Sequence, residues 1–127
     1  MSTKQIIKPA ASPAAVGPYN HAVCVGNLLF CSGQIPLDPA TGQLVAGDIK
    51  AQTERVLENV KSILTDQRLS FANVVKSTVF MTNLGDFAAM NEVYARYFTS
   101  DFPARSTVQV AALPRGASVE IEVVAHY

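Results

Sequence analysis

The fold class is decided by DIKAQTERVLENVKSILTDQ, residues 48–67, and by NVVKSTVFMT, residues 73–82, which follows within a few residues. The first segment predicts an amphipathic helix that begins after Asp48, a good N-cap residue, and ends near Gln67. The second segment is rich in β-branched residues and predicts a strand. One face of the helix carries apolar residues at helical spacing, namely Ile49, Val56, Leu57, Val60, Ile63 and Leu64. A helix of this kind leading into a strand predicts helix-on-sheet packing.

Before this unit, the chain predicts a loop and then a hairpin. Residues 10–20 are rich in Pro, Ala and Gly, which excludes a continuous helix or a central strand there. Two short apolar segments, His21–Val25 and Leu28–Gly33, flank Gly26-Asn27, a dipeptide typical of a tight hairpin turn. The segment from residue 36 to residue 42 contains Asp-Pro and Thr-Gly and reads as turns.

The hairpin also predicts the state of the two cysteines. In a two-residue-turn register, Cys24 faces Leu29 and Cys31 faces Ala22, so the cysteines are diagonal neighbours. Diagonal neighbours lie roughly 7 Å or more apart, which is too far for an unstrained disulfide. The spacing is not CxxC and no histidine cluster is near, so a zinc site is not expected. We therefore predict reduced thiols packed in a sheet.

After residue 82, one helix and two strands are expected. Asp86 can cap a helix that runs to about Thr99, with an aromatic-rich stripe that is more simply core than a cofactor site. The strands are Arg105–Ala111 and Val119–Ala125, joined by a hairpin loop at Leu113–Ala117. The predicted order is ββ(β)αβαββ in one domain, residues 1–127: an α+β, two-layer mixed sheet with two helices on one face.

The last two strands alternate apolar and polar residues, and this predicts a polar sheet face. If the valine-rich sides lie under the helices, the other side carries Arg105, Thr107, Gln109, Glu120 and Glu122. That face is either solvated or meets another subunit, and the high apolar share of the chain favours a closed homo-oligomer. From the residues alone, Arg105 and Glu120 fit a structural ion pair better than a substrate clamp beside a proton-transferring carboxylate.

Composition narrows the function classes. Ten basic and ten acidic residues give zero formal net charge, without a basic stripe of the kind that recruits nucleic acid. There is no apolar segment of about 20 residues and no secretory h-region, so we expect a cytoplasmic protein. The sequence contains no GxSxG, GxGxxG, P-loop or metal-ligand spacing, and His21 and His126 form no recognisable constellation. An enzyme of this sequence would work with few parts.

Short strings along nearly the whole chain resemble one family. They are GPY (17–19), SGQIP (32–36), PATGQ (39–43), AQT (51–53), NVK (59–61), VVKSTVF (74–80), DFA (86–88), NEVY (91–94), PARS (103–106), LP (113–114) and VEIE (119–122). In this order they resemble the Rid family, the reactive intermediate deaminases, also called YjgF-like proteins. The PARS and VEIE segments are among the most specific for that family.

The resemblance implies a fold and an activity. The fold is chorismate-mutase-like and homotrimeric, with sites in the clefts between subunits. The activity is a cofactor-free hydrolysis of reactive 2-enamino and 2-imino acids, such as 2-aminoacrylate and 2-iminobutanoate, to 2-oxo acids and ammonia. These compounds are released by pyridoxal-phosphate-dependent dehydratases, so the implied role is metabolite damage control. No metal is implied. A non-catalytic trimer that binds small carboxylates and a ribonuclease or translation inhibitor are the alternatives.

The resemblance also implies roles for single residues. Arg105 would clamp the substrate carboxylate, and Glu120 would hold the attacking water and manage its proton. Tyr19, Ser32 and the backbone of Gly33 would line the cleft and orient the imine. Two further substrate-binding positions are Asn91, which matches a cleft residue, and Thr107, where relatives often have cysteine. A backbone role at Thr107 would leave the activity unchanged, whereas a thiol role would alter it.

Overall fold

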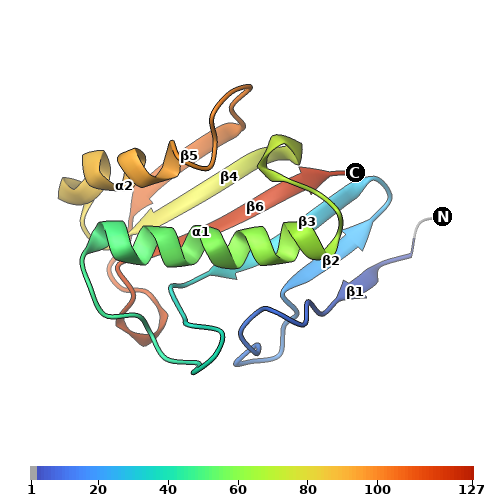
Figure 1. The fold of residues 1–127 in the computed structure, drawn as a ribbon, viewed down its shortest axis with the longest axis horizontal. Coiled ribbons are helices and arrows are strands. Elements are labelled where there is room, and N and C mark those ends of the chain that lie inside the picture. The colour runs from blue at the N-terminus through green and yellow to red at the C-terminus, as the bar shows by residue number, and fades with distance from the viewer. Residues whose placement is uncertain (1–2) are drawn as a thin grey trace.

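The computed structural model describes residues 3–127, which form one α+β domain (Figure 1). Two helices and six strands make up the fold, and short 3-10 turns lie at Phe71–Asn73, Leu84–Asp86 and Pro114–Gly116. In chain order the elements are β1 (Gln5–Ile7), β2 (Ala22–Val25), β3 (Leu28–Gln34), α1 (Ile49–Asp66), β4 (Val74–Met81), α2 (Phe87–Tyr94), β5 (Ala104–Gln109) and β6 (Val119–His126). The predicted fold class, with a mixed sheet and two helices, is confirmed.

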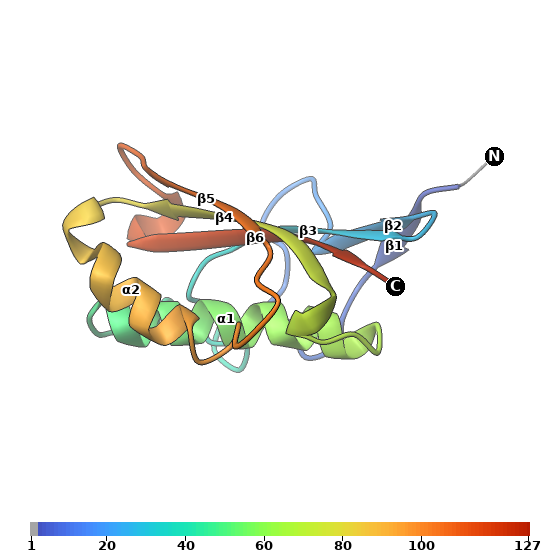
Figure 2. The same ribbon diagram turned by 90° about the horizontal axis from the view of Figure 1, so that it is seen from above.

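The strands form one sheet in the order β1-β2-β3-β6-β4-β5. Neighbouring strands are antiparallel except β4 and β5, which are parallel. Both helices lie against the same face of the sheet, as the edge-on view in Figure 2 shows. The other face, which we call the open face, is covered by no helix of the described chain. The core lies between the helices and the sheet, with β6 at the centre of the sheet.

Helix α1 has the cap, the bounds and the buried face that its sequence predicts. The Asp48 carboxylate accepts a hydrogen bond from the Ala51 backbone amide at 3.0 Å, which satisfies an orphan donor of the first turn. All six apolar residues of the predicted face are buried. The helix ends at Asp66, with Gln67 as the C-cap. The predicted boundaries are confirmed because capping and periodicity are local signals.

The amino-terminal hairpin also forms as predicted. Cys24 pairs with Leu29 and Cys31 pairs with Ala22 across β2 and β3. Gly26 has a φ of 57°, the left-handed conformation that a tight hairpin turn needs. Both cysteines are free thiols. Strand β1, which pairs with β2 at the edge of the sheet, was not predicted, because three residues are too few to show an alternating pattern.

Helix α2 is shorter than predicted. It ends at Tyr94, not near Thr99, although backbone bonds from Tyr97 and Phe98 to the Tyr94 carbonyl continue the turn. The Asp86 side chain makes no capping hydrogen bond, so its predicted role is wrong. The aromatic stripe is nevertheless core, as predicted: Tyr94 stacks on Phe98 with ring centroids 4.3 Å apart.

The predicted hairpin of the last two strands is wrong, because β4 lies between β5 and β6. Strand β6 takes the centre because its inward residues, Val119, Ile121, Val123 and Ala125, are all buried beneath the helices. The connection from β5 to β6 passes over the end of β4. There, Thr82 donates from its amide to the Ser118 carbonyl at 3.2 Å. Alternation along a strand reveals its two sides, but not which strand lies next to it.

Candidate active site

The two candidate catalytic residues lie on opposite faces of the sheet. Arg105 is directly paired with Ser77, whose side chain is fully buried and bonded to α2, so Arg105 is on the helix side. Glu120 is directly paired with Phe80, three residues further along β4. Because side chains alternate along a strand, Phe80 and Glu120 are on the open face.

The predicted polar face is therefore wrong. Thr107 and Gln109 share the helix side with Arg105, since they pair with the buried residues Val79 and Met81. Glu122 shares the open face with Glu120. The parallel pairing of β5 with β4 sets this arrangement. The parallel pairing places Arg105 on the helix side, against α2, and leaves Val108 exposed on the open face.

Arg105 is held by one stripe of α2. Phe87, Asn91 and Tyr94 recur at helical spacing and so face the same way. The Arg105 Nη1 donates to the Asn91 side-chain oxygen at 2.8 Å. Its guanidinium carbon lies 4.7 Å from the Tyr94 ring centroid and 5.6 Å from that of Phe87, both within cation–π range. The fork is thus oriented by neutral groups, and its other donors can meet a planar acceptor such as a carboxylate.

A hollow of about 400 Å³ adjoins the guanidinium, between α2 and the segment that leads into β5. Its walls are mainly apolar and include Phe98 and Phe102. Thr107 follows Arg105 on the same side of β5, and its hydroxyl oxygen is buried without a hydrogen-bond partner among the described residues. We call Arg105, Asn91 and Thr107 the arginine group. The resemblance to the Rid family predicts a cleft position for Asn91, and its hydrogen bond with Arg105 brings these two predicted site residues together.

Glu120 lies on the open face, half buried, against Gly33 of β3. A Cβ at Gly33 would lie 2.8 Å from Cδ and 3.0 Å from Cγ of Glu120, closer than real Cβ atoms normally approach. Burial raises the pKa of the Glu120 carboxyl above its ordinary value, and the nearby negative charge of Glu122 raises it further. A carboxyl tuned in this direction suits proton transfer nearer to neutral pH.

The strand beside Glu120 is distorted. Cys31 pairs with Val123, but Gln34 pairs with Ile121, so β3 has one extra residue at Ser32–Gly33, a β-bulge. Bulges of this kind re-aim side chains and occur next to active sites. This bulge was not predicted from the sequence, although an isolated glycine inside a strand is a signal for one.

The bulge is tied to the loop that precedes β2. The Ser32 hydroxyl donates to the Asn20 carbonyl at 2.5 Å, and the Ser32 amide donates to the His21 carbonyl at 2.8 Å. Tyr19, next to Asn20, is about half exposed, with its ring packed over Gly17. Ser32, Gly33 and Glu120 are therefore brought together, with Tyr19 on the adjoining loop. We call these four residues the glutamate group.

His21 was assigned no role in the sequence analysis, and its contacts are structural. The Gln34 side-chain amide donates to Nδ1 of His21 at 3.3 Å and to the Ser32 carbonyl at 3.1 Å. Since Nδ1 accepts, the proton is on Nε2, which bonds the Pro13 carbonyl. The imidazole thus links the long loop to the end of β3, where the glutamate group lies.

Within residues 3–127, no group of three or more His, Cys, Asp or Glu side chains is arranged to hold a metal ion. In the same part of the chain, neither helix is both long and apolar enough to cross a membrane. The fold and the site together define a class: a small α+β domain that presents a preorganised arginine on one face of its sheet and a carboxyl of raised pKa on the other.

Known proteins resemble the chain over nearly its full length. The family model described as Endoribonuclease L-PSP matches residues 9–127. The protein DfrA of Myxococcus xanthus is 56% identical over 124 residues, which cover 96% of this chain and 95% of that protein. The 2-iminobutanoate/2-iminopropanoate deaminase of Capra hircus is 48% identical over 122 residues, which cover 96% of this chain and 89% of the relative.

Solved structures match the whole domain. A Rid-family protein from Yersinia pestis has a TM-score of 0.95 and 46% identity, covering 98% of this chain and 100% of that one. TdcF of E. coli, solved with bound serine, has a TM-score of 0.92 and 44% identity, covering 97% and 98% of the two chains. The chain belongs to the Endoribonuclease L-PSP family, to which Rid proteins also belong, as the sequence resemblance indicated.

Proposed function

We propose that this protein is a deaminase that hydrolyses reactive 2-imino and 2-enamino acids to 2-oxo acids and ammonia, without a cofactor. The observation that carries the proposal is the setting of Arg105, whose guanidinium is oriented by Asn91 and Tyr94 while no carboxylate of the described residues pairs with it. A fork prepared in this way suits a substrate carboxylate. Relatives named 2-iminobutanoate/2-iminopropanoate deaminase, at nearly half identity over almost the full chain, support this substrate class.

We further propose that the protein is a homotrimer whose sites form between subunits. The arginine group and the glutamate group lie on opposite faces of one sheet, so a small substrate cannot reach both within one chain. A second copy would bring its open face, with Glu120, toward the Arg105 of the first. Apolar side chains on the open-face side support such packing, with Phe30 42%, Val75 44% and Val108 41% exposed.

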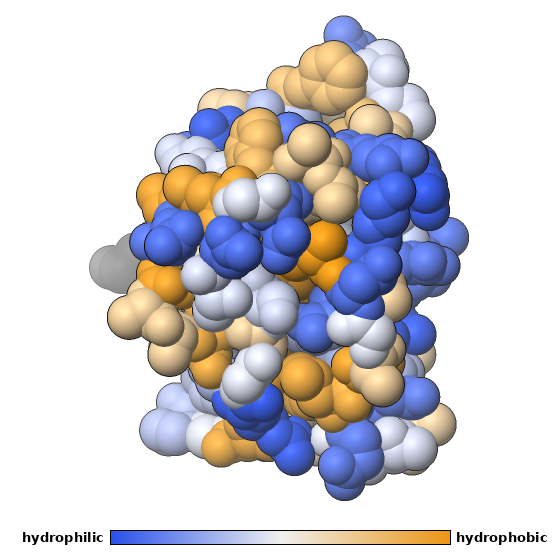
Figure 3. Space-filling view, turned by 90° about the vertical axis from the view of Figure 1, so that its left-hand side faces the viewer, coloured by the Kyte–Doolittle hydropathy of each residue, from blue (hydrophilic) through white to orange (hydrophobic). Residues whose placement is uncertain are grey.

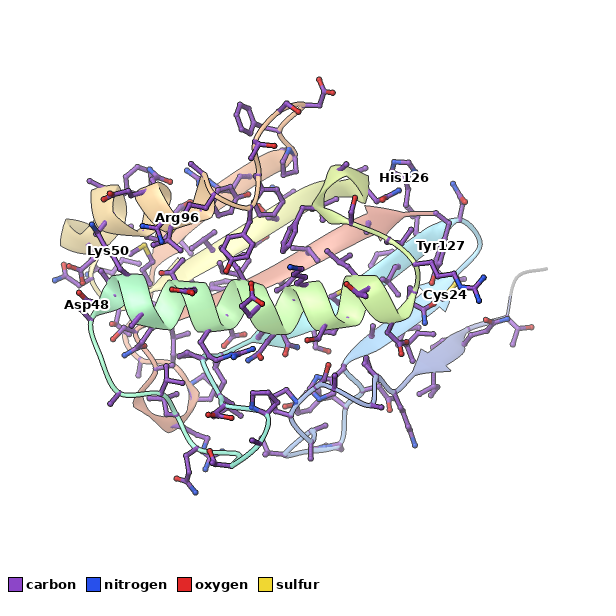
Figure 4. All side chains as sticks on the ribbon, in the orientation of Figure 1. Cys24, Asp48, Lys50, Arg96, His126 and Tyr127 are labelled. Carbon is purple, nitrogen blue, oxygen red and sulfur yellow. The ribbon has the colours of Figure 1, made fainter. Side chains whose placement is uncertain are left out.

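The end of the domain where both helices begin is less suited to this contact. On the end of the domain where both helices begin, small apolar patches are separated by hydrophilic residues (Figure 3). Lys50 and Glu92 form an ion pair at 2.7 Å near that end, and the label of Lys50 in Figure 4 marks the place. An exposed ion pair of this kind is typical of free surface.

In the proposed reaction, Arg105 binds the carboxylate and so fixes C2 of the imine. Glu120 holds a water molecule and takes a proton from it as the oxygen adds to C2 and the C=N π electrons move to nitrogen. The proton passes to that nitrogen and gives a carbinolamine. Glu120 then takes the hydroxyl proton of the carbinolamine and passes it to the nitrogen, so that the C–N bond breaks and neutral ammonia leaves as the C=O bond forms. An enamine substrate first takes a proton at C3. The Gly33 backbone and Tyr19 line the cleft, and Ser32 holds the loop that carries Tyr19.

The test is a coupled assay in which a serine or threonine dehydratase generates the unstable intermediate and ammonia release is followed. Arg105→Ala and Glu120→Gln are each expected to reduce the added rate by roughly 10²-fold or more. Arg96→Ala is the control, because Arg96 is an exposed arginine just after α2 (Figure 4). A wild-type rate in Arg105→Ala would overturn the proposal.

Two other activities are tested in the same preparations. Serine bound in the structure of TdcF favours a protein that binds small carboxylates without catalysis. This alternative predicts binding of 2-oxobutanoate without ammonia release. The name of the matching family model favours ribonuclease activity. That alternative predicts that the protein hydrolyses no imine. It also predicts that RNA cleavage persists in Arg105→Ala. Imine hydrolysis that depends on Arg105 removes both alternatives.

A further inference from the structure

Tyr94 contacts Arg105 and is itself held by a hydrogen bond to a residue of β4. Its hydroxyl and that of Ser77 are 2.7 Å apart, in a bond that joins α2 to β4 inside the core. Ser77 is fully buried and Tyr94 is almost so. Because Ser77 is also the register partner of Arg105, the three residues close a ring: the two strands are paired, Ser77 bonds Tyr94, and Tyr94 contacts the guanidinium.

Packing does not account for the two hydroxyls. Hydroxyl groups lose water when they are buried, and their mutual hydrogen bond only recovers that cost. An apolar pair of similar shape would fill the same space with no such cost. The Tyr94 ring already has a packing partner in Phe98, on which it stacks. What the bond adds is a fixed place for the edge of the Tyr94 ring nearest to β4.

The neutral side chains around Arg105 also leave its guanidinium charge free for a ligand. Burial raises the pKa of the Tyr94 phenol, and the Ser77 hydrogen bond and the Arg105 charge oppose that shift only in part. Tyr94 is therefore neutral near pH 7, as Asn91 is at any pH. A carboxylate in either place would orient Arg105 equally well but would also neutralise it.

We propose that Tyr94, anchored by Ser77, is a positioning residue that holds the Arg105 guanidinium ready for the substrate carboxylate. This inference rests on the proposed function for its substrate, but not for its geometry. It makes the hydroxyl pair a determinant of carboxylate affinity. It assigns the chemistry of the C=N bond to the glutamate group, on the other face of the sheet.

The test compares three conservative variants. Tyr94→Phe and Ser77→Ala each remove one hydroxyl of the pair. Tyr97→Phe is the matched control: it lies three residues after Tyr94, and its hydroxyl also makes one hydrogen bond, to Glu58 of α1 at 2.8 Å, but that bond leads away from Arg105. Its ring packs on Phe71.

For Tyr94→Phe and Ser77→Ala, we expect KM for the dehydratase-generated imine to rise about fivefold, with kcat and its pH profile within about twofold of wild type. Tyr97→Phe keeps the wild-type KM. The dissociation constant of 2-oxobutanoate, measured by calorimetry, rises by the same factor as KM. Melting temperatures of all three variants identify any loss of stability and separate it from loss of affinity.

The outcomes separate the inference from the proposed function. If the wild type hydrolyses the imine and all three variants share its KM, the positioning role is overturned and the deaminase proposal stands. If the wild type releases no ammonia but binds 2-oxobutanoate, and only the Ser77 and Tyr94 variants bind it more weakly, the positioning role stands and the deaminase proposal fails. A fall in kcat at constant KM also overturns the inference.

Discussion

Replacing Gly33 with alanine would place a methyl group where the Glu120 side chain lies. The added Cβ would be 2.8 Å from the Glu120 carboxyl carbon, whereas ordinary contacts begin near 3.4 Å. The carboxyl carbon must therefore retreat by about 0.6 Å, and the nearer oxygen must move further. Gly33 does not have a positive φ, so the backbone accepts alanine without strain.

Two consequences of Gly33→Ala follow, with very different sizes. The obstructing atoms belong to the end of a flexible, half-buried side chain, so the fold should lose only about 1 kcal/mol or less. Catalysis should suffer more, because a displacement of about 1 Å at a reacting group can cost roughly 10²-fold in rate. We expect kcat in the coupled assay to fall by roughly 10- to 100-fold while KM, which reflects Arg105, stays nearly constant.

Gly85→Ala is the control for this experiment. A Cβ there would meet the Asn83 side-chain oxygen at 2.9 Å, a milder clash that also involves a polar side chain, but in the 3-10 turn before α2. It should leave kcat unchanged. A wild-type kcat in Gly33→Ala, or a fall in kcat no larger than that of Gly85→Ala, would refute the predicted displacement of the Glu120 carboxyl.

Three further predictions concern titration, burial and reactivity. Removal of a negative charge lowers the raised pKa of Glu120, so Glu122→Gln should move the acid limb of the kcat/KM profile to lower pH; an unchanged limb contradicts this assignment. Thr107→Val removes a buried hydroxyl that has no partner, so the melting temperature should stay level or rise by a few degrees at most in thermal unfolding, and a clear fall would show a missed hydrogen bond. Burial raises the pKa of the Cys31 thiol to about 12, so iodoacetamide at pH 8 should label Cys24 and spare Cys31 in the native protein; equal labelling, read by mass spectrometry, would contradict the burial.

Features set by neighbouring residues were predictable from the sequence. The start of α1 at Asp48 and the hairpin at Gly26-Asn27 follow from contacts within a few residues, and both are present with the expected bounds or register. The end of α2 was less predictable. The backbone leaves the helix at Tyr94, while the aromatic stripe continues into the core, so apolar spacing alone extends the helix too far.

Strand pairing was not predictable in the same way. The alternation of polar and apolar residues along the strands that carry Arg105 and Glu120 is visible in the sequence. The insertion of β6 between β3 and β4 is not, because it depends on residues far apart in the chain. One wrong pairing placed both residues on one face of the sheet. The bulge at Ser32–Gly33 and the hydrogen bond from Arg105 to Asn91 are likewise tertiary features. The candidate site residues came from the family resemblance, and their division between the two faces of the sheet came from the structure.

The most direct test of the central claim, a site shared between subunits, mixes two inactive variants. Arg105→Ala supplies an intact Glu120, and Glu120→Gln supplies an intact Arg105. If each site takes these residues from different subunits, equal parts unfolded and refolded together should recover about one quarter of wild-type activity, because random assembly leaves that share of sites intact. If both residues of a site belong to one chain, the refolded mixture should show no more activity than the separate variants.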